Sequence, residues 1–184
     1  MNWTSPQFSV PTGAHVTTLI GMIHSGDTLL WKEGNLATAG LEDVAEVGSI
    51  TKMNQEIDAI ITKNKALSKF QITAPLITGI AETTLIFNTA FPYISFASMI
   101  APSPDWFMGI SSVRLFENNK WLDELDLNIR VYDAGTEDGD VFGYNNPSTF
   151  PQQPVAQLTP AIATVLANKN TSIAPIATIR FVRN

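Results

Sequence analysis

The hydrophobic pattern of the chain changes near residue 70, from a helical repeat to the alternation typical of strands. Residues 36–69 are predicted to be helical. In a first helix, Leu41, Val44 and Ala45 recur at positions i, i+3 and i+4, and Gly48 supplies a stop. A second helix carries an apolar face formed by Met53, Ile57, Ile60 and Ile61.

Beyond residue 70 the chain is rich in Thr, Ile, Phe and Val, which favour strands. Four alternating segments are predicted as strands: 84-TLIFNTA-90, 93-YISFASMI-100, 125-LDLNIRVY-132 and 176-IATIRFVR-183. Turn-forming residues separate them. Strands and loops at this spacing predict one mainly β domain over residues 1–184, an antiparallel β-sandwich with a two-helix insertion near residues 36–69.

Composition excludes several classes of function. The chain has 184 residues, a formal net charge of −6 and no cluster of Lys or Arg, so a nucleic-acid partner is not expected. Because there is no cysteine, a disulfide scaffold and a thiol catalyst are excluded. No apolar run reaches the roughly 20 residues that span a bilayer. The first residues, MNWTSPQF, do not have the pattern of a signal peptide.

The segment 24-HSGD-27 places His24, Ser25 and Asp27 together and suggests a hydrolase. Adjacent residues of one loop rarely converge as a catalytic triad, because the roles depend on geometry and not on sequence proximity. The chain also lacks a G-x-S-x-G motif. A structural role for His24, as a hydrogen-bonding partner within its loop, is therefore the preferred interpretation.

The segment 132-YDAGTEDGD-140 holds four acidic residues among glycines directly after a predicted strand. Carboxylate oxygens on a flexible loop suit Ca²⁺, which is a hard cation. The spacing does not fit an EF-hand loop. A solvated acidic loop is the alternative explanation.

Asp105 lies in the stiff apolar segment 101-APSPDWFMGI-110, with no Lys or Arg within eight residues on either side. A carboxylate beside Trp106 and Phe107 is unfavourable to bury without a partner. If the strands that end at Ile100 and Tyr132 finish at the same end of a sandwich, Asp105 and Asp133 could share a cation. The alternative is that Asp105 caps the turn that follows it.

Four tryptophans, Trp3, Trp31, Trp106 and Trp121, adjoin turn-like segments. An aromatic side chain on a loop can anchor a sugar or a protein. It can also cover the core of its own domain. For Trp106, both a ligand-binding role and a core-covering role stay open.

Several segments together resemble the spondin domain family. They are 102-PSPDWFMGI-110, 113-VRLFENNKW-121, 131-VYDAGTEDGD-140 and 151-PQQPV-155, together with 20-IGMIHSGDTLLWKEGNLATAGLEDVAEVG-48 and 174-APIATIRFV-182. The resemblance covers nearly the whole chain from Trp3 onward. The combination of P-S-P-D-W with Y-D-A-G-T is highly specific to this family.

The resemblance implies a C2-like β-sandwich with a divalent-cation site, in which Asp105 and Asp133 take the places of the family's metal-binding aspartates. The animal proteins add a glutamate on the strand before P-S-P-D, and that place falls on Ile86, which cannot coordinate a cation. Asn88 or Glu82 could substitute for it, and Glu137 of the acidic loop is a weaker candidate.

The resemblance also implies a non-enzymatic, extracellular protein that acts in adhesion or recognition of a cell-surface or matrix protein or glycan. A single spondin domain without cysteine looks more like a bacterial secreted or surface protein. The family usually has a strand before the place of Trp3, and none is found here. An exposed sheet edge would then allow assembly into oligomers, which is the alternative function. A lectin-like protein and a hydrolase are the remaining alternatives.

Overall fold

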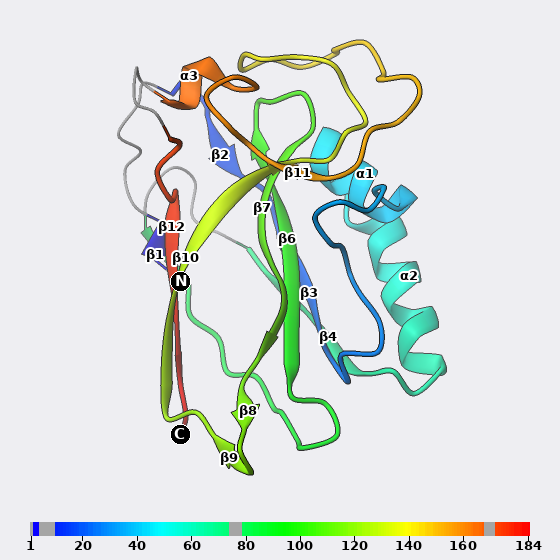
Figure 1. Ribbon diagram of the computed structural model, residues 1–184, viewed down its shortest axis with the longest axis vertical. Coiled ribbons are helices and arrows are strands. Elements are labelled where there is room, and N and C mark those ends of the chain that lie inside the picture. Colours follow the sequence, from blue (N-terminus) through cyan, green and yellow to red (C-terminus); the bar gives the residue numbers. More distant parts are fainter. Residues whose placement is uncertain (1, 4–9, 74–78, 168–171) are drawn as a thin grey trace.

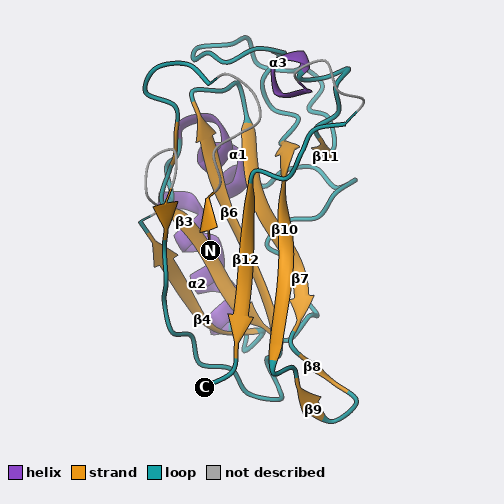
Figure 2. Ribbon diagram, turned by 90° about the vertical axis from the view of Figure 1, so that its left-hand side faces the viewer, coloured by secondary structure: helices purple, strands orange, loops and turns teal. Residues whose placement is uncertain are grey.

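The computed structural model describes residues 2–3, 10–73, 79–167 and 172–184. It shows two layers of antiparallel strands, with a pair of helices covering the outer side of one layer (Figures 1 and 2). The predicted mainly β sandwich with a helical insertion is confirmed. Within these ranges, no helix has both the length and the apolar character needed to cross a membrane.

The first layer contains five long strands in the order β4, β3, β6, β7 and β10. Their bounds are Ala66–Ile72 for β4, Leu19–His24 for β3, Tyr93–Ala101 for β6, Trp106–Arg114 for β7 and Glu124–Asp133 for β10. Two short strands extend this layer at its upper end: β2 (His15–Val16) pairs with β6, and β11 (Ala156–Gln157) pairs with β10.

Strand β10 joins the two layers, because its two halves pair with different neighbours. Residues Arg130–Asp133 pair with β7, whereas Glu124–Ile129 pair with β12 (Ala177–Val182). The second layer continues from β12 to β1 (Asn2–Trp3) and β5 (Gly79–Ile80). A small hairpin of β8 (Phe116–Glu117) and β9 (Lys120–Trp121) projects between β7 and β10.

Two apolar cores lie on either side of the first layer. The core between the layers contains Phe96, Met108 and Ile129, and the core beneath the helices contains Met22, Leu41 and Ile57. Every residue of β3 is buried, because one face of this strand lies against the second layer and the other against the helices. Burial of both faces explains why its sequence, LIGMIH, does not alternate.

The helices α1 (Ala39–Val47) and α2 (Thr51–Thr62) match the predicted insertion. Thr38 caps α1 by accepting a hydrogen bond from the Leu41 amide, and Gly48 ends it in the left-handed conformation, as predicted. The short helix α3 (Thr164–Ala167) lies at the upper end of the sandwich (Figure 1).

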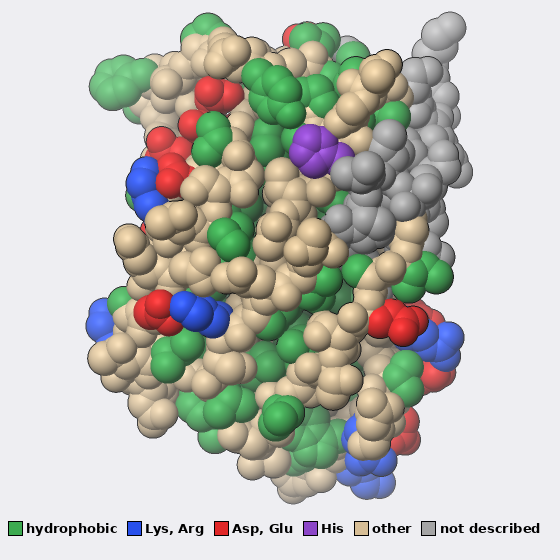
Figure 3. Space-filling model, turned by 180° about the vertical axis from the view of Figure 1, so that it is seen from behind, with side chains coloured by type: hydrophobic (Ala, Val, Ile, Leu, Met, Phe, Trp, Pro, Cys, Tyr) green, Lys and Arg blue, Asp and Glu red, His purple; other side chains and the backbone are tan. Residues whose placement is uncertain are grey.

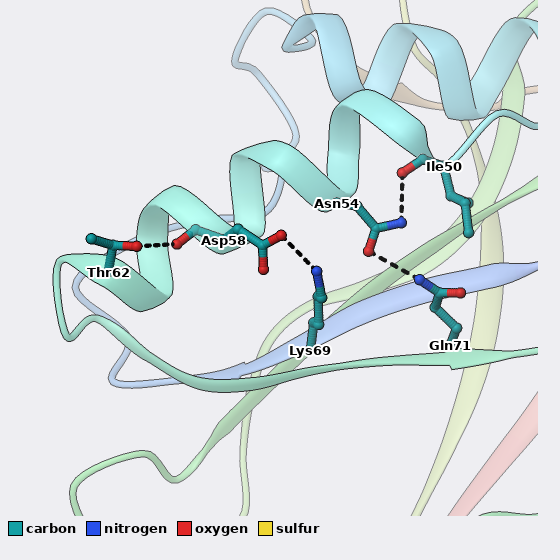
Figure 4. A network of polar contacts seen from close by, with 6 residues as sticks. All are labelled: Ile50, Asn54, Asp58, Thr62, Lys69 and Gln71. Carbon is teal, nitrogen blue, oxygen red and sulfur yellow. Dashed lines mark hydrogen bonds and ion pairs between the residues drawn. The ribbon is translucent and has the colours of Figure 1, made fainter.

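Polar contacts hold α2 against the outer face of β4 (Figure 4). Lys69 Nζ lies 2.7 Å from Asp58 Oδ2, and Gln71 Nε2 donates a hydrogen bond of 3.0 Å to Asn54 Oδ1. Phe70 and Ile72, on the opposite face of the same strand, pack against the core between the layers. The alternation of β4 therefore directs its polar side chains toward α2 and its apolar side chains into the core between the layers.

Two sequence predictions about these elements were wrong. The helical region does not extend to residue 69, since Ala66 already begins β4. The segment 84–90 is not a ladder strand, although Leu85 and Phe87 pack against the core as its alternation suggested. Alternation reports which face of a segment is buried, but it does not reveal whether the backbone has a neighbour to pair with.

Gly109 of β7 makes room for the Trp31 side chain. The indole Nε1 of Trp31 donates a hydrogen bond of 2.9 Å to the Phe96 carbonyl, directly beside Gly109. A Cβ atom on Gly109 would lie 2.2 Å from that carbonyl oxygen and 3.1 Å from the indole. The position therefore has no space for a side chain.

The substitution Gly109→Ala is expected to destabilise the domain by about 1–3 kcal/mol, because backbone atoms must move to admit the methyl group. For a domain of this size, that loss lowers the melting temperature by roughly 5 °C. Gly143→Ala is the matched control, since a Cβ there meets no atom within 4 Å. Thermal unfolding followed by circular dichroism tests the pair, and equal melting temperatures for the two variants would contradict this packing.

Candidate cation site at one end of the sandwich

Asp105 and Asp133 lie at the same end of the sandwich, because their strands are direct neighbours. Asp105 precedes the first residue of β7, and Asp133 is the last residue of β10. Trp106 pairs with Asp133 in the antiparallel ladder, and the Ala134 amide donates to the Asp105 carbonyl over 3.1 Å. The start of β7 and the end of β10 lie at the loop-bearing upper end in Figure 1.

The carboxylate of Asp105 is fully buried, with an exposed fraction of 0%. Its Oδ2 atom accepts hydrogen bonds from the amides of Thr136 (2.7 Å) and Glu137 (3.1 Å) and from the Thr136 hydroxyl (3.3 Å). Its Oδ1 atom is buried and has no hydrogen-bond partner. Burial raises the pKa of Asp105, and the bonds from Thr136 and Glu137 oppose that rise.

Asp105 does not cap the turn that follows it, so that alternative was wrong. Ser103 has this role, since its hydroxyl accepts a 3.1 Å hydrogen bond from the Trp106 amide. Asp105 instead holds residues 136 and 137 of the loop after β10. One oxygen thus fastens two loops together, while the other is left without a partner.

Asp133 is partly buried beside Asp105. Its Oδ1 atom accepts a 2.8 Å hydrogen bond from the Gly135 amide. Burial raises the pKa of Asp133 to about 7, and the negative charge of Asp105 adds to the rise. Gly135 has a positive φ of 75° and passes so close to the Gln153 carbonyl that a Cβ would lie 2.1 Å from its oxygen.

Two glutamates complete an acidic cluster. Burial raises the pKa of Glu137 to about 7, and the charges of Glu46 and Asp105 contribute. Burial also raises the pKa of Glu46, opposed by a hydrogen bond with the Thr136 side chain; the charges of Glu42, Asp105 and Asp43 raise it further. Because these charges affect one another's pKa values, Asp105, Asp133, Glu137 and Glu46 are treated as one acidic cluster.

The cluster concentrates negative charge, and none of its four carboxylates forms an ion pair with a Lys or Arg among the described residues. The pKa of Lys52 is raised by its hydrogen bond to Asp43 and further by the charge of Glu46, but its ammonium is paired with Asp43, outside the cluster. In the ranges that the structure describes, no three acidic or histidine side chains already converge as a metal-ligand set. The arrangement offers carboxylate oxygens from two adjacent strand ends, which are the ligand type that hard divalent cations take.

Glu82 and Asn88 are not brought to this cluster. Both precede β6, whose nine residues separate them from the segment containing Asp105. At about 3.3 Å per residue, the strand spans roughly 25 Å. Asn88 Oδ1 accepts bonds from the Ala90 and Phe91 amides within its own turn. The prediction of a third ligand from this segment therefore fails on distance, and Ile86 in the same segment is 79% exposed to solvent.

Sequence reasoning missed Glu46. It lies in the last turn of α1, where a negative charge faces the negative end of the helix dipole. An acidic residue at this unfavourable position, in a helix without a basic residue in its last turn, was the available signal. Its proximity to Asp105 arises only from the packing of α1 on the first layer.

Trp106 cannot contact a ligand from solution, so that part of the ligand-binding prediction was wrong. Its side chain is fully buried and packs edge-on against Phe142, with ring centroids 5.6 Å apart. Trp31 is also buried, Trp121 is partly buried, and the Trp3 side chain lies outside the described residues. The aromatic side chains exposed near the cluster are Tyr144, at 55%, and Phe150, at 97%.

His24 has the structural role that was preferred. Its Nε2 lies 2.9 Å from the Ser95 hydroxyl, and its Nδ1 accepts from the Gly26 amide, so the imidazole is neutral. Burial lowers its pKa to about 4. Ser25 donates instead to the Lys65 carbonyl, and His24 does not bond to it. The three residues of 24-HSGD-27 do not form a triad.

Comparison with known proteins identifies the family. The family model described as Spondin_N matches residues 2–170, which is most of the chain. The chain belongs to the spondin domain family. The resemblance found in its motifs is confirmed, and the acidic cluster is therefore a feature of a spondin domain.

The spondin domain aligns with several spondins over most of its length. It is 33% identical to Spondin-2 of Rattus norvegicus over 186 residues, covering 97% of this chain and 56% of that protein. It is 32% identical to Spondin-2 of Homo sapiens, covering 97% and 55%. With Spondin-1 of Gallus gallus it shares 32% identity, covering 86% and 21%. The chain spans about half the length of the Spondin-2 proteins and about a fifth of Spondin-1.

The pKa values of Asp133 and Glu137 predict a pH-dependent stability. In a chelator, the melting temperature is expected to fall as the pH rises from about 6 to 8. The folded domain holds these protons up to a pKa of about 7, whereas the unfolded chain has already released them near pH 4. The folded state thus binds more protons in this range and loses stability as they leave.

Thermal unfolding at constant ionic strength measures this dependence. Asp133→Asn should flatten the curve, and Asp140→Asn, an exposed acidic residue of the same loop, should leave it unchanged. His24 acts in the opposite sense at lower pH: with a pKa lowered to about 4, it removes stability as the pH falls from about 6.5 toward 4. A wild-type curve that is flat between pH 6 and 8 would contradict the assignment.

Proposed function

We propose that this spondin domain is an extracellular recognition or adhesion module whose loop-bearing end is ordered by Ca²⁺. Asp105 and Asp133 are its proposed protein ligands, with Glu137 and Glu46 close enough to add charge. Membership of the spondin domain family supports the extracellular recognition role. The function does not involve catalysis.

The observation that carries this proposal is the unpartnered Oδ1 atom of Asp105. A buried carboxylate oxygen without a hydrogen bond loses its hydration and gains nothing in return. The neighbouring carboxylate of Asp133 makes burial of the Asp105 charge still more unfavourable, because the two negative charges repel each other. A divalent cation between them would supply the missing partner and reverse the repulsion. The residues present therefore fit a cation.

Ca²⁺ is favoured over Mg²⁺ because the site is irregular. Two side chains on adjacent strand ends leave several coordination positions to backbone carbonyls and water, which Ca²⁺ accepts at 6–8 ligands and flexible geometry. Mg²⁺ requires a near-ideal octahedron. The small number of charged protein ligands supports an affinity typical of extracellular Ca²⁺ sites rather than of tight cytosolic buffers.

The cation would act on the loop that follows β10. This loop is fastened to Asp105 through Thr136 and Glu137, and it folds back so that the Thr149 amide donates to the Thr136 carbonyl over 2.8 Å. Phe150 follows directly and is almost fully exposed. Ordering of the loop by Ca²⁺ would hold Phe150 and Tyr144 in fixed positions for contact with a partner. Trp106 cannot make this contact, because its side chain is buried.

Ca²⁺ is expected to raise the melting temperature of the domain. At a free concentration 100 times the Kd, binding to the folded state alone adds about 2.7 kcal/mol, which corresponds to roughly 5–10 °C. Asp105→Asn should abolish this response and should also be more stable than the wild type in chelator. The amide keeps an acceptor near Thr136 and removes the buried charge. Differential scanning calorimetry with and without Ca²⁺ measures both effects.

The double variant Asp105→Asn, Asp133→Asn tests the ligand set, with Asp140→Asn as the matched control. The control should keep the full response to Ca²⁺. If the double variant responds like the wild type, Asp105 and Asp133 are not the ligands.

Binding to a partner is expected to require Ca²⁺. Arrays of glycans and of matrix proteins, probed with the labelled domain in Ca²⁺ and in chelator, should give signals that are lost in chelator and in the double variant. Phe150→Ala should weaken these signals about tenfold or more without changing the Ca²⁺-induced rise in melting temperature. Signals that persist equally in chelator would oppose a Ca²⁺-ordered recognition surface.

A further inference from the structure

The segment 147–155, which leads from the loop after β10 into β11, forms a fixed edge at the loop-bearing end of the domain. On one side, the Gln153 amide donates a hydrogen bond of 2.8 Å to the Gly135 carbonyl. On the other side, the Val155 amide donates over 2.8 Å to the Asn35 carbonyl, and the Val155 side chain is buried in the core beneath the helices. The backbone of this segment is therefore held from both sides.

Four apolar side chains project from this edge into solvent. Phe150 is 97% exposed, and Leu36, which pairs with Pro154 in an antiparallel bridge, is 58% exposed. Pro151 and Pro154 are also exposed. These four residues form a surface that we name the Phe150 ridge. A phenylalanine in water on a fixed backbone adds nothing to the core of its own domain, and a group of such side chains marks a contact surface.

The Phe150 ridge lies away from the described ends of the chain. The Gln152 side chain donates over 3.1 Å to the Ala37 carbonyl, just before α1, and the segment lies at the upper right in Figure 1. Asn2 instead pairs with Thr178 in the second layer, and Arg183 lies at the lower end of that layer, beside Val182 of β12.

Asp138 places a negative charge next to the ridge. Its Oδ1 atom accepts a 2.6 Å hydrogen bond from the hydroxyl of Thr149, the residue directly before Phe150. Asp138 is exposed, and among the described residues it forms no ion pair. Asp140 of the same loop is also exposed. Figure 3 shows acidic side chains gathered at the upper left, near hydrophobic side chains that project from the same end.

The charge is nearly balanced at the other end of the ridge. Lys32 and Glu33 are adjacent and both exposed, and the Asn35 amide, next to Leu36, donates over 3.1 Å to the Lys32 carbonyl. The excess negative charge therefore lies at the end of the ridge with Asp138. A partner that matches the surface needs a positive charge at one side of its apolar contact.

We propose that the Phe150 ridge binds a protein segment in which arginine or lysine stands next to apolar side chains. The apolar side chains cover Phe150 and the two prolines, and a cationic side chain pairs with Asp138. An arginine can also stack its planar guanidinium on an aromatic ring. The inference names the chemistry of the partner in the proposed function, and it rests on that proposal for the presentation of Phe150 in Ca²⁺.

Other partners match this surface less well. A neutral glycan could stack on Phe150, but it would leave the negative charge of Asp138 without a counter-charge. A membrane with anionic lipids would be repelled by Asp138 and Asp140, and an acidic protein would be repelled in the same way, since like charges across an interface disfavour the complex. An exposed aromatic ring beside an unpaired carboxylate therefore favours a basic segment with apolar side chains.

Asp138 stays available when Ca²⁺ occupies its proposed site. The proposed ligands are Asp105 and Asp133, whereas the Asp138 carboxylate is bonded to Thr149. Ca²⁺ would act on the ridge through Thr136, whose carbonyl accepts the Thr149 amide over 2.8 Å. The cation and the basic partner therefore use different carboxylates.

The probe is a fluorescein-labelled synthetic peptide of eight alternating Arg and Leu residues. We expect saturable binding to the domain in Ca²⁺, measured by fluorescence anisotropy. The same peptide with citrulline in place of arginine keeps the planar side chains but lacks their charge, and it should bind at least tenfold more weakly. Because exposed charges are screened by salt, binding of the arginine peptide should also weaken between about 0.05 and 0.5 M NaCl.

Two pairs of variants locate the contact. Phe150→Ala should weaken peptide binding at least tenfold, whereas Ile86→Ala, which truncates a side chain that is 79% exposed elsewhere, should leave it unchanged. Asp138→Asn should weaken binding about fivefold, and its amide oxygen can still accept the bond from Thr149. Asp27→Asn, at an exposed position that follows β3, is the matched control and should have no effect. Phe150→Ala and Asp138→Asn should both still be stabilised by Ca²⁺.

Equal affinities of the Phe150→Ala and Ile86→Ala variants would overturn the proposal, and so would equal affinities of the two peptides. Binding of a neutral glycan on an array without binding of the arginine peptide would also overturn it. If Ca²⁺ raises the melting temperature but the peptide does not bind, this inference fails and the proposed Ca²⁺ site stands. Peptide binding that is equal in Ca²⁺ and in chelator would support the ridge and count against its ordering by Ca²⁺.

Discussion

The buried carboxylate of Asp105 constrains the whole loop-bearing end of this spondin domain. One of its oxygens receives two backbone amides and a hydroxyl from the loop after β10, while the other has no partner. The first oxygen fixes the position of the loop. The second oxygen is buried without a partner, and the negative charges of Asp133 and two glutamates make its burial more unfavourable. The proposed cation follows from this imbalance, since the same contacts that order the loop also prevent the carboxylate from reaching water.

The sandwich places these groups together through a single strand. Because β10 pairs with β7 at its upper end and with β12 at its lower end, it closes the two layers and brings Asp133 beside Asp105. In the second layer, β12 and residues 82–87 line an apolar cleft over the inner face of the first layer.

Much of this architecture could be predicted from the sequence, because β6, β10, β12 and the two helices have clear periodicity and stop signals. Asp105 could be singled out because no Lys or Arg lies near it in the sequence, and Asp133 from the acidic loop that follows its strand and from the resemblance to the spondin domain family. Contacts between distant segments could not be predicted. Glu46 joins the cluster only when α1 packs on the sheet, and Trp106 is covered by Phe142 from a loop far along the chain. The alternation of residues 84–90 indicated a buried face correctly, but pairing depends on neighbours that a single sequence does not reveal.

The position of a bound ion tests the central claim most directly. A crystal structure of the domain grown in Ca²⁺, with anomalous diffraction data collected at long wavelength, would locate Ca²⁺ independently of any change in stability. We predict an anomalous peak about 2.3–2.6 Å from Asp105 Oδ1 and within coordination distance of an Asp133 oxygen. Absence of a peak at saturating Ca²⁺, with Asp105 Oδ1 hydrogen-bonded to water or to a protein donor instead, would contradict the account.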